Sequence, residues 1–164
     1  MLLILMRHAK AVRPEDARSD EARGLTPQGR RDAALTAAHM REAGLEPVHA
    51  LVSPAERTRQ TAAIVAETFD QMAVQFVPTL YLAEPRTILQ TALNKPRSCL
   101  LMIGHNPGLH ELTIDFLDQA HDRSKLARDL RERFTTSCYA AFTLSGETVT
   151  APGPALHDAF TPRD

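Results

Sequence analysis

The chain has 164 residues, of which 43% are apolar and 24% are charged. This composition is typical of a soluble globular domain and excludes a disordered, fibrous or large multidomain protein. The 19 basic and 20 acidic residues leave a formal net charge of -1, so no overall basic field attracts nucleic acid or an anionic membrane. We therefore expect one domain over residues 1–164, in which any anion binding comes from a local cluster of charges.

The cysteines and the apolar amino terminus indicate in which cellular compartment the protein is found. Cys99 and Cys138 are too few for a disulfide framework and fit no metal-ligand spacing. The apolar run Leu2–Met6 is far shorter than the roughly 20 residues that span a bilayer, and it lacks the basic start and cleavage site of a signal peptide. We expect a cytoplasmic monomer that uses no metal or cofactor and binds neither nucleic acid nor membrane.

Apolar runs and helical patterns alternate along the chain. Leu2–Met6 is typical of a strand covered on both faces. Thr26 followed by Pro27 predicts a helix that ends at Gly44. The later units are a strand at Ala50–Val52, a helix capped by Ser53 and Pro54, a strand at Gln75–Val77, a helix from Pro85 to Pro96, a strand at Cys99–Ile103, a turn at Gly104–Gly108 with a helix after it, and an amphipathic helix at Leu126–Phe134.

The last part of the chain predicts a hairpin. Tyr139–Leu144 and Thr148–Thr150 have strand character, and Ser145–Glu147 between them contains a turn glycine. We expect the tail after Pro152 to be irregular. Strands separated by helices favour a parallel sheet, and a hairpin adds antiparallel strands. The predicted fold class is therefore α/β, a three-layer sandwich with a mainly parallel, mixed central sheet flanked by helices.

Basic side chains stand directly after several predicted strands. Arg7 and His8 follow the first strand, Arg57 comes shortly after the second, and His105 follows the strand at Cys99–Ile103. In open α/β sheets, ligands bind outside the carboxyl ends of the strands. We therefore expect these two histidines and two arginines to converge at one edge of the sheet.

This combination of side chains indicates phosphate chemistry. Two guanidinium groups and a helix amino terminus form a binding site that suits a tetrahedral anion. A neutral imidazole beside such a site can attack phosphorus, so that one difficult displacement becomes two easier ones through a covalent phosphohistidine. Adjacent positive charge lowers the pKa of His8 from its reference value of about 6.5, which keeps this nucleophile unprotonated.

Three segments together resemble the motifs of the histidine phosphatase superfamily, and within it the small SixA-type phosphohistidine phosphatases. Leu2–Ala11, Ser53–Ala62 and Gly104–Gly108 are similar to the first, second and third motifs. The resemblance implies a phosphoglycerate mutase-like fold and a site in which His8 is the nucleophile, Arg7 and Arg57 bind phosphate, His105 is the second active-site histidine, and Arg23 and Asn106 contact the substrate.

Two residues in or near these motifs, Ala9 and Asp20, need separate comment. Ala9 stands where the superfamily usually has glycine after the nucleophilic histidine, and the SixA-type branch tolerates alanine there. Asp20 either orients Arg23 or simply lies in a loop.

The general acid of many superfamily members has no clear counterpart. Glu84 is the nearest candidate, although its position favours a solvated or capping carboxylate over a general acid. An alkoxide leaving group needs a proton from the enzyme, whereas the imidazole of phosphohistidine is expelled far more easily. The sequence thus favours a phosphatase acting on phosphohistidine of a partner protein.

Two alternatives stay open. The same catalytic core would serve a small phosphomonoester such as a sugar phosphate. A non-catalytic phosphate-binding or phosphocarrier domain would keep the histidine without hydrolysing its phosphate. A cysteine-nucleophile phosphate loop is excluded, because neither Cys99 nor Cys138 has an arginine six positions later. The motifs of P-loop, zinc-dependent and serine hydrolases are also missing.

Overall fold

The computed structural model describes residues 1–95, 97–144 and 153–162. Within these residues one sheet has the strand order β3-β2-β4-β1-β5-β6. Its strands are β1 (Leu2–Arg7), β2 (His49–Val52), β3 (Ala73–Phe76), β4 (Cys99–Gly104), β5 (Tyr139–Thr143) and β6 (Ala155–Phe160). The strands β3, β2, β4 and β1 are parallel to one another, whereas β5 pairs antiparallel with both β1 and β6. The predicted mainly parallel, mixed sheet is confirmed.

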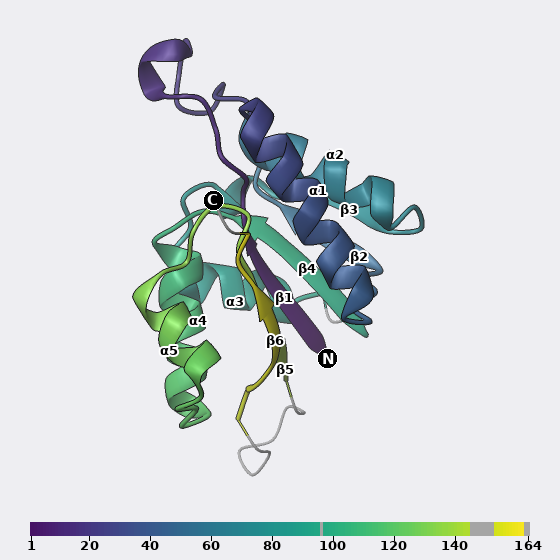
Figure 1. Ribbon diagram of the computed structural model, residues 1–164, viewed down its shortest axis with the longest axis vertical. Helices are drawn as coiled ribbons and strands as arrows, with labels where there is room; N and C mark the ends of the chain where they lie inside the picture. The colour runs from purple at the N-terminus through teal and green to yellow at the C-terminus, as the bar shows by residue number, and fades with distance from the viewer. Residues whose placement is uncertain (96, 145–152, 163–164) are drawn as a thin grey trace.

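Helices cover both faces of this sheet (Figure 1). The helices α1 (Pro27–Glu42) and α2 (Glu56–Thr68) lie on one face, and α3 (Pro85–Leu93), α4 (Gly108–Gln119) and α5 (Lys125–Glu132) lie on the other. Two short 3-10 helices, η1 (Pro14–Asp16) and η2 (Pro78–Leu80), occur in the connections. The parallel strands β1, β2, β3 and β4 thus deliver their last residues to the same end of the sheet in this three-layer sandwich.

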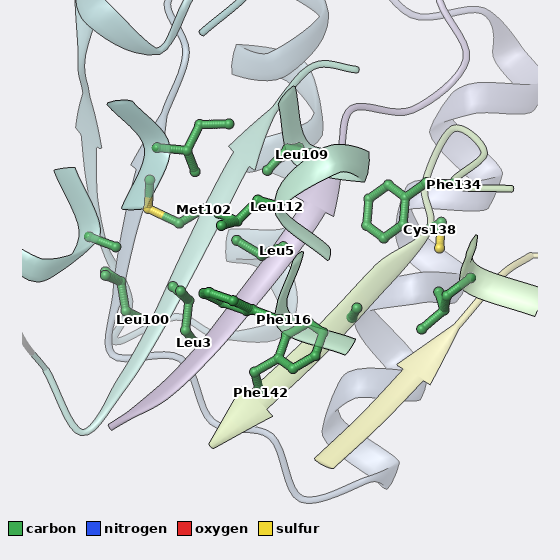
Figure 2. Packing of buried hydrophobic residues seen from close by; sticks show 14 of the residues in the cluster. Leu3, Leu5, Leu100, Met102, Leu109, Leu112, Phe116, Phe134, Cys138 and Phe142 are labelled. Carbon is green, nitrogen blue, oxygen red and sulfur yellow. The ribbon is translucent and has the colours of Figure 1, made fainter. Parts of the chain in front are cut away.

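Alternate residues of β1 explain why this strand is apolar throughout. Leu3 and Leu5 pack against α4 and its neighbours, where Phe116 and Phe142 also lie (Figure 2). Ile4 and Met6 point to the opposite face, into the cluster that contains residues of α1 and α2. All four β1 side chains are fully buried, as expected for the central strand of a sheet with two covered faces.

The ends of α1 follow the signals in the sequence. The Thr26 hydroxyl accepts a hydrogen bond from the Gly29 backbone nitrogen at 3.0 Å, which satisfies one of the free donors of the first turn. Gly44 has a φ of 72°. It donates its backbone N–H to Arg41, and Leu45 donates to Met40, which is the Schellman arrangement at a helix end.

The predicted start of α2 is wrong by two residues. The helix begins at Glu56, and Ala55 occupies the N-cap position in extended conformation without a side-chain cap. The Ser53 side chain is fully buried and bonded elsewhere, so it does not cap this helix. A Ser-Pro pair before a helix therefore has a different purpose in this chain.

The tail is a second point where the sequence prediction was wrong. Residues after Pro152 form β6, which pairs with β5 and is only partly buried. Because β6 is an edge strand, it needs no continuous apolar run, and the prolines around it resemble those of a loop. The strand predicted at Thr148–Thr150 lies outside the described residues. No helix in the described ranges is long and apolar enough to cross a membrane.

Candidate active site

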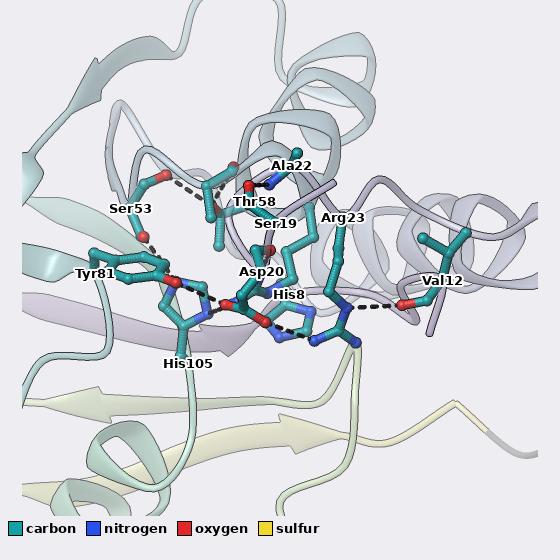
Figure 3. Close-up of polar contacts among 12 residues, drawn as sticks. His8, Val12, Ser19, Asp20, Ala22, Arg23, Ser53, Thr58, Tyr81 and His105 are labelled. Atoms are coloured by element: carbon teal, nitrogen blue, oxygen red, sulfur yellow. Dashed lines mark hydrogen bonds and ion pairs between the residues drawn. The ribbon is translucent and has the colours of Figure 1, made fainter. Parts of the chain in front are cut away.

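His8 and His105 follow neighbouring parallel strands. Arg7 ends β1 and pairs in register with Gly104, the last residue of β4, so His8 and His105 follow at the same level. The His8 backbone nitrogen donates to the Gly104 carbonyl at 3.1 Å. As a result, the two imidazole rings lie with their centroids 5.3 Å apart (Figure 3). The predicted convergence of the strand ends is therefore realised for this pair.

Arg57 reaches the histidines from the first turn of α2. Its side chain is 3% exposed. One terminal nitrogen, NH2, donates to His105 Nδ1 at 3.2 Å and to Asp20 Oδ2 at 3.0 Å. The other, NH1, donates to the Asp20 backbone carbonyl at 2.7 Å. The planar guanidinium group thus joins α2, the loop after β1 and the end of β4 at one point.

His8 is held as a neutral ring in one tautomer. Its Nδ1 lies 2.8 Å from the Ala9 carbonyl oxygen. A carbonyl can only accept, so Nδ1 carries the proton and Nε2 keeps its lone pair. Burial lowers the pKa of His8 to about 3, and the nearby His105, Arg57 and Arg7 side chains act in the same direction. The imidazole is therefore neutral at neutral pH, with Nε2 ready to attack.

Thr61 fixes the backbone beside His8. Its hydroxyl accepts from the Ala9 backbone nitrogen at 3.0 Å and donates to the Arg57 carbonyl at 2.7 Å. The Ala9 carbonyl, which accepts the hydrogen bond from His8 Nδ1–H, therefore belongs to a residue that is anchored to α2. Thr61 occurs in the second motif, although sequence reasoning assigned it no role.

His105 is also held as a neutral ring in a defined tautomer. The Arg57 guanidinium can only donate, so His105 Nδ1 accepts and Nε2 carries the proton. That proton points to the Ser53 hydroxyl, since the two atoms are 2.7 Å apart. Burial lowers the pKa of His105 to about 4, and the positive charge of Arg57 adds to the effect. The buried Ser53 thus orients the second histidine.

Arg7 and Asn106 share one backbone acceptor. Arg7 NH1 and Asn106 Nδ2 donate to the Phe134 carbonyl at 3.0 and 2.8 Å. Arg7 Nε, Arg57 Nε and Asn106 Oδ1 are buried and have no hydrogen-bond partner within the described residues. Unpaired buried donors are costly, and Arg7 and Arg57 each keep one such Nε–H group.

Arg23 joins the site through Asp20. Its Nε donates to the Val12 carbonyl at 2.8 Å and its NH1 to Asp20 Oδ1 at 2.9 Å. Of the two roles open for Asp20, the structure shows the orienting one. Tyr81, which follows η2, donates its hydroxyl to Asp20 Oδ2 at 2.7 Å. Its ring meets His105 edge-on, with centroids 5.5 Å apart. Nothing in the sequence pattern pointed to Tyr81.

Glu84 lies apart from this cluster. It occupies the N-cap position of α3 without a side-chain cap bond. It borders a surface hollow whose other lining residues include Arg86, Leu89 and Asp115, and none of the residues that line this hollow is His8, Arg57 or His105. Within the described residues, no group of three or more His, Cys, Asp or Glu side chains gathers that could hold a metal ion.

Comparison with known proteins agrees with this geometry. Residues 3–81 match the model of the histidine phosphatase superfamily, branch 1. An uncharacterized protein of Mycobacterium tuberculosis is 33% identical over 144 residues, which cover 86% of this chain and 88% of that protein. The chain belongs to the histidine phosphatase superfamily.

Solved structures define the branch more closely. A putative phosphohistidine phosphatase SixA from Nakamurella multipartitia superposes with a TM-score of 0.81 at 28% identity, covering 98% of this chain and 95% of that one. The protein histidine phosphatase SixA complexed with tungstate gives a TM-score of 0.75 at 25% identity, with 98% and 97% coverage. Within the superfamily, this chain is of the SixA type.

Proposed function

We propose that this protein hydrolyses phosphohistidine on a partner protein, through a covalent phosphohistidine formed on His8. The observation that carries the proposal is the state of His8. Its Nδ1–H is bonded to the Ala9 carbonyl, its pKa is lowered to about 3, and two arginines and His105 surround it. Membership of the histidine phosphatase superfamily supports phosphatase activity in general.

The reaction proceeds in two displacements. In the first, the Nε2 lone pair of His8 forms a bond to phosphorus as the phosphorus–nitrogen bond of the substrate breaks. The departing imidazole takes the electron pair and then a proton from water. In the second, a water molecule forms the new phosphorus–oxygen bond and gives a proton to the hydroxide left by the first step. The His8–phosphorus bond breaks, its electron pair returns to Nε2, and inorganic phosphate leaves. Arg7, Arg57 and Arg23 neutralise the phosphoryl oxygens throughout.

The substrate class is supported by the state of the nearest carboxyl group. Hydrogen bonds from Tyr81, Arg23 and Arg57 hold the pKa of Asp20 well below its usual range, so this group is a carboxylate that has no proton to donate. An alkoxide leaving group would need such a proton, whereas an imidazole does not. Glu84 remains a proposal for a general acid, and it would have to reach the site from its place at α3.

A phosphohistidine-bearing protein tests the proposal. The native chain should release inorganic phosphate from it, and His8→Ala should release none. His157→Ala, a matched histidine replacement on the edge strand β6, should behave like the native chain. A panel of sugar phosphates and other phosphomonoesters runs in parallel, and faster hydrolysis of one of these would favour the small-molecule alternative. Accumulation of an acid-labile phosphoprotein without phosphate release would show a carrier instead.

We also propose that the protein is cytoplasmic. Cys99 and Cys138 are both free and buried, and burial raises the pKa of each thiol to about 11. Such thiols are unreactive, and their unpaired state suits a reducing compartment.

A further inference from the structure

Asp20 connects three separate segments that border the active site (Figure 3). Its Oδ1 accepts from Arg23 at 2.9 Å, and its Oδ2 accepts from Arg57 at 3.0 Å and from the Tyr81 hydroxyl at 2.7 Å. Its backbone carbonyl accepts from Arg57 at 2.7 Å. One residue of the loop after β1 therefore fixes side chains from that loop, from α2 and from the segment after η2.

A carboxylate bound to phosphate-binding arginines can act in two opposite ways. It can occupy the place of the phosphoryl group and compete with it, or it can hold the arginines from behind and so prepare them for the phosphoryl group. In the first case its removal helps the substrate, and in the second its removal harms turnover. The contacts around Arg57 distinguish the two.

The contacts of Arg57 show which of its donors are already used. Both terminal nitrogens of Arg57 are directed to Asp20 and His105, whereas its buried Nε has no partner. The negative charge of Asp20 also raises the pKa of His105. Asp20 and His105 therefore set the orientation of Arg57 within the protein itself, which favours the supporting role.

The carboxylate also adjusts the charge of the site. Arg7, Arg23 and Arg57 contribute three positive charges, and Asp20 reduces the sum to two, which matches a phosphoryl dianion. Asp20 is 45% exposed, yet four hydrogen bonds hold it. This arrangement is what a fixed support needs, because each guanidinium keeps free donors while its orientation is set.

We propose that Asp20, assisted by the Tyr81 hydroxyl, is a positioning residue that sets Arg57 and Arg23 for phosphoryl transfer and, through Arg57, fixes the tautomer of His105. The proposal rests on the phosphatase function given above. Within the described residues, the hydrogen bonds of the Asp20 carboxylate go to Arg23, Arg57 and Tyr81. Its contribution to the rate passes through the arginines.

Kinetics of four variants test this role. Asp20→Asn should lower kcat at least tenfold, Tyr81→Phe should lower it several-fold, and the double variant should be no slower than Asp20→Asn, because both changes act on one shared carboxylate. Asp16→Asn removes an acidic charge from the same loop at an exposed position and should leave kcat unchanged. Circular dichroism checks that each variant is folded, and Tyr81→Phe removes only a single oxygen atom.

Inorganic phosphate serves as the probe of affinity. If Asp20 were a competitor, Asp20→Asn would keep the native kcat and bind inorganic phosphate more tightly, because the site gains one net positive charge. That result would overturn the proposal. Additive losses in the double variant would also overturn it, since the two groups would then act independently.

A spectroscopic measurement separates this proposal from the proposed function. Long-range 1H–15N NMR of the free protein should show His105 protonated at Nε2 alone, and Asp20→Asn should convert it to a mixture of tautomers. This readout needs no substrate, so it remains valid if the protein hydrolyses another phosphate compound. An unchanged single tautomer in Asp20→Asn would contradict the path through Arg57.

Discussion

Replacement of Arg57 by lysine separates charge from geometry in the active site. Lysine keeps the positive charge but concentrates its donors at one point, whereas the guanidinium group is a planar fork. Arg57 now serves three acceptors, the Asp20 carbonyl at 2.7 Å, Asp20 Oδ2 at 3.0 Å and His105 Nδ1 at 3.2 Å. A single ammonium group cannot serve all of these and a phosphoryl oxygen as well.

The expected loss is mainly in rate. Removal of one preorganised donor to a developing oxyanion costs about 3 kcal/mol of transition-state stabilisation, by analogy with oxyanion holes. At about 1.4 kcal/mol for each factor of ten, kcat/KM should fall roughly 150-fold. The cost in folding free energy should be smaller, about 1 kcal/mol or less, because the Asp20 carboxylate is 45% exposed and water can solvate it.

The assay compares initial rates of phosphate release for the native chain, Arg57→Lys and Arg59→Lys. Arg59 is two residues further along α2, donates Nε to the Pro54 carbonyl at 2.8 Å, and lies 4.0 Å from the centroid of the Phe76 ring. Because these contacts are outside the site, Arg59→Lys should retain native kinetics. If folded Arg57→Lys stayed within threefold of the native kcat/KM, the fork geometry would be irrelevant and the reasoning refuted.

Three further predictions concern stability and pH. In the folded protein, burial lowers the pKa of His8 to about 3 and that of His105 to about 4. In the unfolded chain, the pKa of a histidine is about 6.5. The unfolded state thus binds more protons between these values, so the free energy of unfolding should decrease as pH falls from 6.5 to 4. Urea titrations at several pH values measure this, and His8→Ala should flatten the slope. Ser53→Ala leaves the His105 Nε2–H without its acceptor and should cost about 1–3 kcal/mol in urea unfolding, with a lower kcat; an unchanged midpoint would mean that the bond has no effect. Gly108→Ala would place a methyl group 1.9 Å from the Ala83 carbonyl oxygen, so its Tm should fall by several degrees, and a native Tm would contradict that packing.

Sequence reasoning located the parts of the site that follow a general rule of sheet architecture. His8, Arg57 and His105 could be grouped in advance because parallel strands present their carboxyl ends at one edge, and each residue stands just beyond such an end. The sequence singled out Ser53 but predicted the wrong role for it. A serine before a proline is typical of a helix cap, and only the fold shows that its hydroxyl faces His105 instead.

The remaining contacts depend on segments that are distant in the sequence. Tyr81 is 61 positions from Asp20, and its segment has no pattern that distinguishes it from an ordinary loop. The Phe134 carbonyl belongs to the backbone, so no side-chain type marks it. The strand β6 was missed because an edge strand with one partner needs only partial burial, which gives a weak apolar signal.

Because Arg7 and Asn106 both donate to the Phe134 carbonyl oxygen, the three motifs alone do not contain the complete site. Arg7 is aimed by an oxygen that lies 127 positions later in the chain, and Asn106 depends on the same atom. Grafting the three strand-end motifs onto another parallel sheet would copy the reactive imidazole without the oxygen that orients its arginine. A transplant of this chemistry therefore has to include the turn that follows α5.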